Sequence, residues 1–333
     1  MTQVGKCPKA NDRERWRDCP LEVRLDYRQK SIFAHPCMTD VINAISQRKR
    51  SRLRGGRARG IFVVAPPNGG KTTLNRHLSL QYPKVVLEDR TITQYAEVVV
   101  PSPCSLLTMS NAILASIGDG DSEGKSMGVQ RKRVLEMLPQ AETLFLAIDN
   151  FHDIRERTGP GGLQEVGNLL RDIIDMPRVI VLAFGTDDAR FVLASNKQLR
   201  RRVPGELNLS GYDITTKLGL AKYLRLIDMF DETLPLAERS GLAYGQMGKA
   251  LAFGSDANIG FLADLLDLAM EFAVCDGREQ IILSDLYSAY SSYFLGLASA
   301  NPFEPGYKEW RRLNLDGEPY FSVVDRRDRK RVK

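Results

Sequence analysis

The chain has 333 residues, of which 43% are hydrophobic and 26% are charged, and its net charge is +6; this composition excludes global disorder and the length suits two domains. Its apolar runs fall short of the roughly 18 residues of a membrane helix, and the N-terminus lacks an apolar signal segment, so we expect a cytoplasmic protein without a membrane partner. Five scattered cysteines without a CxxC pair, and only three histidines, support neither a disulfide framework nor a zinc site.

Residues 1–60 form a polar, mostly helical N-terminal extension that ends in a basic run. From Arg48 to Arg59 the sequence RKRSRLRGGRAR contains no acidic residue. Clustered positive charge favours a polyanion because binding releases the condensed counterions. A solvated linker is the alternative interpretation. The predicted DNA-binding residues are Arg48, Lys49, Arg50, Arg52 and Arg54, with Lys125, Arg131 and Lys132 as second choices farther along the chain.

Residues 61–210 alternate between short apolar runs and amphipathic stretches. The runs predict strands at 61–65, 84–87, 97–100, 144–148 and 179–184, and the intervening segments predict helices at 72–79, 106–117, 129–138 and 163–174. Strands that alternate with helices indicate an α/β domain whose parallel sheet is covered on both sides.

The strand signal stops near residue 212. Apolar residues then recur at helical spacing through 262–273, and 283–294 continues the helical pattern. We therefore predict a smaller all-α domain over 211–300. A basic tail over 301–333 follows, and its last eight residues, RRDRKRVK, carry a second positive cluster.

A phosphate-binding loop is predicted between the strand at 61–65 and the next helix. The sequence APPNGGKT at 65–72 fits GxxxxGK[ST], except that Ala65 replaces the first glycine. In such a loop, backbone N–H groups surround phosphates, the lysine neutralises the β and γ oxygens, and the hydroxyl binds Mg²⁺. We therefore predict ATP and Mg²⁺ as cofactors. The predicted nucleotide-binding residues are Pro66, Pro67, Asn68, Gly69, Gly70, Lys71, Thr72 and Thr73.

The strand at 144–148 ends in Asp149, which completes a predicted Mg²⁺ site with Thr72. Most P-loop ATPases of this type place a glutamate next, to polarise the attacking water. Here Asn150 follows, and an amide cannot accept that proton. We therefore expect slow hydrolysis, unless Asp153 or Glu156 serves as a substitute base.

Two more positions are predicted to act on the nucleotide. Thr186 follows the strand at 179–184 and is placed either to contact the γ-phosphate or its water, or to cap the next helix. The triple arginine at 200–202 follows a helix. It is a source for an arginine finger that reaches a neighbouring subunit's ATP, and a solvated helix end is the alternative.

The order of these motifs resembles the TniB/TnsC family of transposition ATPases, which are relatives of MuB. The family motif D-E-x-H appears as DNFH at 149–152, G-T-x-x-A as GTDDA at 185–189, and Q-L-x-x-R-F as QLRRRV at 198–203. The segments LPLAERSGL at 234–242, IGFL at 259–262 and NPF at 301–303 continue the resemblance. The match assigns the finger to Arg202, with Arg201 as the close competitor. Ala65, Asn150 and Val203 depart from the family pattern.

The resemblance implies an AAA+ P-loop NTPase core, an α/β fold with a parallel sheet, followed by a small all-α lid. It further implies an ATP-dependent regulator of DNA transposition that assembles as a ring or helical filament, with hexameric turns, on double-stranded DNA. Such a protein recruits or activates a DDE transposase, together with a TniQ-like target selector. Because no base-reading motif is evident, DNA binding should be driven by the backbone and tolerant of sequence.

Two other functions remain open on the sequence alone. A replication-type AAA+ loader or initiator would use the same nucleotide chemistry. A nucleotide-gated scaffold would bind ATP without hydrolysing it and without a nucleic-acid role.

Overall fold

The computed structural model describes residues 13–57, 59–120, 126–158, 161–209, 212–294 and 300–308. The chain divides into two compact units, one formed by Pro36–Ser210 and the other by Met1–His35 with Gly211–Lys333. The sequence pattern grouped residues 1–60 as one extension, whereas the two parts of that segment belong to different units. Lys125 and the tail from residue 309 onward lie outside the described residues.

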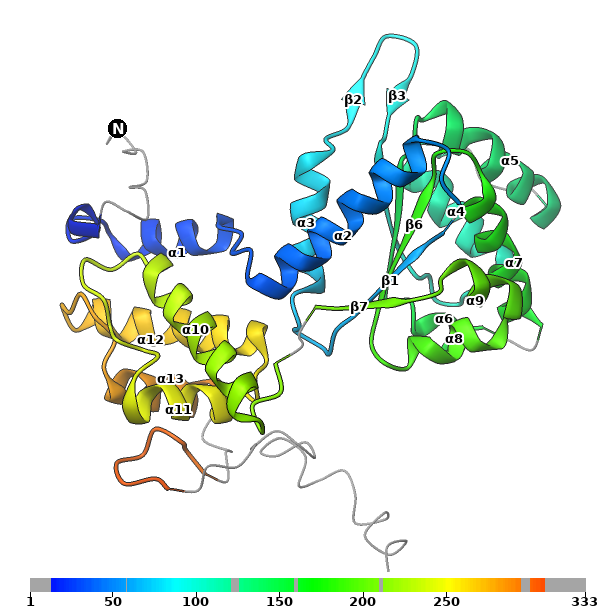
Figure 1. Cartoon of the computed structure of the whole chain (residues 1–333). Helices are drawn as coiled ribbons and strands as arrows, with labels where there is room; N and C mark the ends of the chain where they lie inside the picture. Colours follow the sequence, from blue (N-terminus) through cyan, green and yellow to red (C-terminus); the bar gives the residue numbers. More distant parts are fainter. Residues whose placement is uncertain are drawn as a thin grey trace, which may run out of the picture. The chain divides into compact units, whose positions relative to one another are not determined.

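A five-stranded parallel sheet forms the centre of the first unit, as predicted. Its strands are β1 (Ile61–Val64), β4 (Tyr95–Val99), β5 (Phe145–Asp149), β6 (Ile180–Gly185) and β7 (Glu206–Asn208), in the order β4-β5-β6-β1-β7 (Figure 1). β1 and β6 are buried along their whole length, because both faces of these strands are apolar and covered. The register pairs Val64 with Gly185 and Val99 with Asp149, so the carboxyl ends of these strands meet at one edge.

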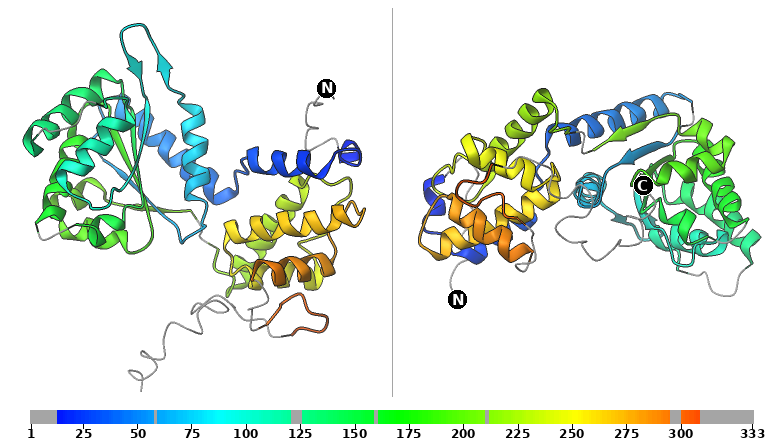
Figure 2. Two further views of the ribbon diagram at one scale, coloured as in Figure 1. Left: turned by 180° about the vertical axis from the view of Figure 1, so that it is seen from behind. Right: turned by 90° about the horizontal axis from the view of Figure 1, so that it is seen from below.

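Helices cover both faces of the sheet (Figures 1 and 2). One face packs on α4 (Leu106–Ser116), α5 (Met127–Gln140), α6 (Asp153–Glu156), α7 (Gly162–Asp175), α8 (Ala189–Ser195) and α9 (Lys197–Arg202). The other face lies toward α2 (Pro36–Leu53) and α3 (Lys71–Gln81). Leu146 and Ile148 of β5 point into the first core, and the alternation of a strand therefore turns Asp149 toward the side of α3.

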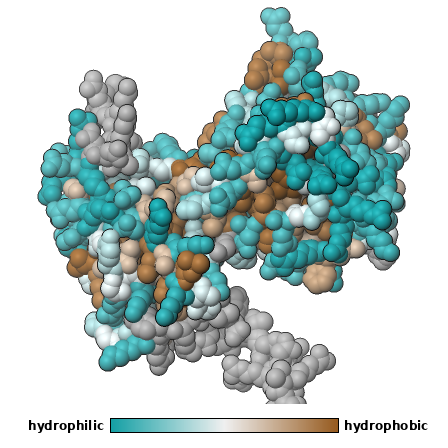
Figure 3. Space-filling view, viewed as in Figure 1, coloured by the Kyte–Doolittle hydropathy of each residue, from teal (hydrophilic) through white to brown (hydrophobic). Residues whose placement is uncertain are grey.

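A strand forms within the predicted run at 84–87, but it does not join the parallel sheet, and that part of the prediction was wrong. β2 (Val85–Val86) instead pairs antiparallel with β3 (Thr91–Ile92), and Leu87 donates to the carbonyl of Arg90 across the turn. Charged residues at 88–90 reverse the chain before the run can reach the sheet, and β4 takes the edge position. Val86 is 79% exposed, and the hairpin shows hydrophobic surface in Figure 3.

The second unit is helical, as predicted for 211–300. It contains a short 3₁₀ helix, η1 (Arg13–Trp16), and α1 (Leu21–Lys30), α10 (Lys217–Thr233), α11 (Gly245–Gly254), α12 (Ile259–Cys275) and α13 (Leu283–Tyr293). Arg24 of α1 is 2% exposed and donates to both carboxylate oxygens of Glu279, at 2.9 and 2.8 Å. Among the described helices, none has the length and apolarity that a membrane crossing requires.

Candidate nucleotide-binding site

The predicted phosphate-binding loop connects β1 to the first turn of α3. Asn68 and Gly70 adopt left-handed backbone, with φ of 57° and 85°, a conformation that asparagine and glycine tolerate best. α3 begins at Lys71, and within the described chain no side chain caps its first N–H groups. Thr72 and Thr73 in that first turn are exposed. A helix N-terminus of this kind, preceded by a tight glycine turn, presents backbone donors to an anion.

Ala65 fits the position where the motif expects glycine. It is absent from the residues with positive φ, and its N–H donates to the Gly185 carbonyl at 3.0 Å, so it extends the pairing of β1 with β6. The glycine that this turn requires is Gly69, where a Cβ would approach the Ala65 methyl to 2.8 Å. The departure at Ala65 therefore leaves the loop intact.

The side chain of Lys71 is hydrogen-bonded to backbone carbonyls of this loop, which a bound phosphate can replace. Its ammonium group donates to the carbonyls of Ala65 and Pro66, at 2.9 and 2.8 Å. Burial lowers the pKa of Lys71, while the charge of Asp149 opposes that shift. The lysine and the aspartate therefore lie close enough to interact, one on α3 and the other at the end of β5.

Asp149 and Thr72 supply the oxygen ligands that Mg²⁺ prefers. Asp149 accepts the Asn150 N–H through Oδ1 at 2.8 Å, and its second oxygen has no hydrogen bond to any described residue. The carboxylate and the exposed Thr72 hydroxyl thus fit a Mg²⁺ ion as ligands, directly or through water.

Asn150 occupies left-handed backbone, with φ of 55°. Asparagine is one of the few residues that tolerate this conformation, whereas a glutamate would lose about 1–2 kcal/mol. The amide at this position is therefore explained by the local backbone, and its side chain cannot accept a proton.

Thr186 lies where the sequence predicted it, directly after β6. Its hydroxyl is buried and has no hydrogen-bond partner among the described residues, and it does not cap α8, whose N-cap is Asp188. His152 Nδ1 is likewise buried without a partner in that part of the chain. Both lie by Gly185, since a Cβ there would come within 3.6 Å of His152 Nδ1. Two unsatisfied polar groups at the carboxyl edge of the sheet favour a polar ligand.

The two substitute bases suggested by the sequence lie on α6. Asp153 is buried, and its carboxylate is paired with Arg157 at 2.6 Å and with His152 at 3.4 Å. Glu156 is exposed, at the end of that short helix. The pairing of Asp153 opposes its use as a base.

Sequence reasoning missed Glu97, a carboxylate on β4. Asn75 of α3 donates to Glu97, and the Tyr95 hydroxyl donates to the Asn75 carbonyl oxygen. Burial and the charge of Asp149 both raise the pKa of Glu97. The signal was present, because Glu97 is the one charged residue in the apolar run YAEVVV, but strand pairing was needed to place it beside β5.

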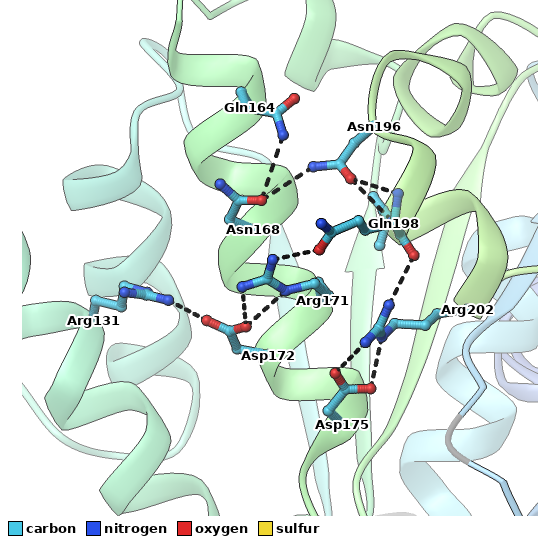
Figure 4. Close-up of polar contacts among 10 residues, drawn as sticks. Arg131, Gln164, Asn168, Arg171, Asp172, Asp175, Asn196, Gln198 and Arg202 are labelled. Atoms are coloured by element: carbon cyan, nitrogen blue, oxygen red, sulfur yellow. Dashed lines mark hydrogen bonds and ion pairs between the residues drawn. The ribbon is translucent and has the colours of Figure 1, made fainter.

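Arg202 is held by a carboxylate of its own subunit (Figure 4). Its guanidinium donates to both oxygens of Asp175 on α7, at 2.6 and 2.5 Å. This hydrogen bonding raises the pKa of Arg202 and lowers that of Asp175. Arg201 is exposed and has no polar partner among the described residues. The two candidates for the finger thus differ, one paired and one free.

Some of the predicted DNA-binding residues contact other residues of this chain, and others have no partner among the described residues. Arg52 donates to the carbonyls of Ile174 and Met176 at the end of α7, and Lys49 lies over the Tyr82 ring at 4.6 Å. Arg131 is paired with Asp172 (Figure 4), and exposed Lys132 lies 3.6 Å from Glu136. Arg50 and Arg54 are exposed and unpaired within the described residues, and Arg48 is half-buried. Of the predicted DNA-binding residues that the structure describes, Arg50 and Arg54 are thus exposed and without a partner, and they lie at the end of α2 and just after it.

The sheet order, the loop after β1 and the acid at the end of β5 define an AAA+ P-loop NTPase fold with a helical region at its C-terminal side. Residues 24–207 match the family model described as Bacterial TniB protein. The chain therefore belongs to the TniB family, as the motifs predicted.

Solved structures share the fold at low identity. The ORC2 protein of Aeropyrum pernix, in ADPNP–ADP complexes, is 17% identical with a TM-score of 0.54, over 75% of this chain and 66% of that one. The ORC1 protein of Aeropyrum pernix, in complex with DNA, is 16% identical with a TM-score of 0.54, over 84% and 69%. Cdc6p from Pyrobaculum aerophilum is 16% identical with a TM-score of 0.52, over 92% and 73%. The chain thus spans just under two thirds of the ORC2 protein, and no curated protein matches it.

Proposed function

We propose that this protein is an ATP-dependent, DNA-binding regulator of DNA transposition. The observation that carries the proposal is the juxtaposition of Lys71 and the N-terminus of α3 with Asp149, in a chain of the TniB family. Backbone donors and the lysine bind the β and γ phosphates, and Thr72 and Asp149 hold Mg²⁺, which neutralises phosphate charge. Thr73 lies in the same turn, within reach of the phosphates.

Assembly follows from the arginines of α9. The hydroxyl of Thr186 senses the γ-phosphate within a subunit, whereas Arg202, or its neighbour Arg201, reaches the γ-phosphate of the next subunit. Arg202 must leave Asp175 to do so, because that carboxylate occupies its guanidinium. ATP then links adjacent subunits into a ring or helical filament with hexameric turns.

DNA binding in this proposal uses the free end of α2. Arg50 and Arg54 contact phosphates, and Arg48 and Lys49 add charge beside them. Such contacts are non-specific, so the assembly forms on double-stranded DNA of any sequence. The assembled protein recruits or activates a DDE transposase and works with a TniQ-like target selector, as the family resemblance implies.

Hydrolysis is expected to be slow, because Asn150 lacks the proton-accepting group of a glutamate. The ATP-bound assembly would therefore be long-lived and act as a marker of target DNA.

One experiment tests the core of this proposal. Strand transfer by a purified DDE transposase is measured with target DNA, ATP and either the wild-type protein or Lys71→Ala. Stimulation by the wild type alone is expected. Equal stimulation by both proteins, or by neither, contradicts an ATP-gated role in transposition.

A further inference from the structure

Glu97 lies beside the proposed nucleotide site and has no role in the function described so far. It sits on β4 opposite Ala147, two residues before the pair Val99–Asp149. Ala96 and Val98 point into the core under α4 and α5, so alternation turns Glu97 to the face of α3, where Asp149 also points. The electrostatic effect of Asp149 on the pKa of Glu97 agrees with that placement.

The carboxylate of Glu97 is oriented by a buried polar pair. Asn75, one turn after Lys71 on α3, is 2% exposed and donates to Glu97 Oε1. The amide of Asn75 is in turn held by the hydroxyl of Tyr95, which is also buried. Glu97 itself is exposed, and its Oε2 has no hydrogen bond to a described residue. One oxygen is thus fixed to the phosphate-binding helix, and the other faces solvent at the edge of the sheet.

We infer that Glu97 is the general base for the slow ATP hydrolysis that remains when position 150 carries an amide in place of a glutamate. This inference rests on the proposed nucleotide function. Glu97 is a better candidate than Asp153, which is paired with Arg157, because it has a free oxygen and a fixed geometry next to Asp149.

In the proposed step, Glu97 Oε2 accepts a proton from the attacking water. The water oxygen forms a bond to the γ-phosphorus while the bond from that phosphorus to the β–γ bridging oxygen breaks. The bonding pair leaves with ADP. The proton then passes from Glu97 to the released phosphate, which restores the carboxylate.

The decisive variant is Glu97→Gln, which keeps an oxygen that accepts from Asn75 but removes the base. Phosphate release is measured at saturating ATP with Mg²⁺ and duplex DNA, and nucleotide affinity is measured with a fluorescent ATP analogue. We expect the rate to fall by roughly 10²-fold or more with little change in affinity. Glu165→Gln, at an exposed glutamate in the first turn of α7, is the matched control and should keep the wild-type rate.

A structural tie between α3 and β4 is the competing explanation. It predicts that Glu97→Gln lowers Tm and leaves the rate unchanged, and this result would overturn the inference. If the glutamine variant fails to fold, Glu97→Asp retains the charge with a shorter reach. Its rate should fall by up to about 10²-fold, since the base is misplaced by about 1 Å, and an unchanged rate would reject the assignment.

The two proposals fail in distinguishable ways. A wild-type protein that does not bind the ATP analogue overturns the nucleotide function and this inference together. A wild-type protein that binds the analogue but releases no phosphate, or a Glu97→Gln variant that hydrolyses normally, overturns only the role of Glu97.

Discussion

Two cations in this unit are proposed to meet phosphate, and they are held by different partners. Lys71 donates to two neutral carbonyls of its own loop, whereas Arg202 donates to both oxygens of the charged Asp175 carboxylate. Both sets of hydrogen bonds have a charged donor, but only the arginine pair is bidentate and joins two opposite charges. Lys71 can therefore leave its two carbonyls readily when a nucleotide binds. Arg202 must give up the Asp175 carboxylate in order to bind the γ-phosphate of the neighbouring subunit.

Because the two cations are held differently, nucleotide binding and assembly have different requirements. Binding needs only the phosphate loop of one subunit, but assembly must also displace Asp175. Because the pair is partly exposed, with side-chain accessibilities of 28% for Arg202 and 44% for Asp175, it is worth no more than about 1 kcal/mol. The arginine pairing would thus tune the concentration at which subunits assemble and would not block assembly.

The largest effect is expected from Lys71→Ala. The substitution removes the charge that faces the β and γ phosphates, so ATP-dependent assembly on DNA should be lost, as measured by light scattering. Lys222→Ala removes an exposed lysine from α10 and serves as the control. Normal assembly by Lys71→Ala would show that the phosphate-loop assignment is wrong.

Arg202→Ala should weaken ATP-dependent oligomers by at least about tenfold in protein concentration, because the γ-phosphate of the neighbour loses a charged donor worth about 1.5–3 kcal/mol. Nucleotide affinity of the monomer should stay at the wild-type value. Analytical ultracentrifugation measures the first quantity and equilibrium titration the second. If neither Arg201→Ala nor Arg202→Ala changes the oligomer, the arginine-finger role is removed.

Asn150→Glu should raise the hydrolysis rate about tenfold and shorten the lifetime of the DNA-bound assembly. A second base next to Asp149 accounts for the gain, and strain of about 1–2 kcal/mol in left-handed backbone limits it. Asn150→Asp, which tolerates that backbone better, is the control for strain. If Asn150→Glu hydrolyses ATP at the wild-type rate, the amide of Asn150 does not limit hydrolysis.

Asp175→Asn should promote ATP-dependent assembly, whereas Arg202→Ala should weaken it. It frees the arginine without removing it, so assembly should need up to about fivefold less protein, given about 1 kcal/mol for an exposed pair. Analytical ultracentrifugation over the same range of protein concentrations measures this change in assembly. A higher requirement for protein would indicate that Asp175 supports the active position of Arg202.

The smallest effects concern single phosphate contacts. Arg50→Ala and Arg54→Ala should each lower the slope of log affinity against log salt by about 0.9. Arg52→Ala should instead lower Tm, because Arg52 binds carbonyls at the end of α7. Unchanged salt slopes for Arg50→Ala and Arg54→Ala would show that DNA does not bind at the end of α2.

Local signals made most of the fold predictable. Continuous apolar runs identified β1, β5 and β6, and the glycine turn before Lys71 identified the phosphate loop, since both depend on neighbours in sequence. The antiparallel hairpin at Val85–Val86 and the carboxylate of Glu97 could not be predicted in the same way. Both depend on which strand occupies the edge of the sheet, and that choice is made by contacts distant in sequence. The partner of Arg202, which is 27 positions away, was hidden for the same reason.

The central claim is that ATP controls assembly of this protein on DNA, and sedimentation velocity tests it most directly. The wild-type protein is examined with a duplex of unrelated sequence, with and without a non-hydrolysable ATP analogue. The account predicts large complexes only when duplex and nucleotide are both present. Complexes of the same size without nucleotide, or none with both ligands, would contradict it.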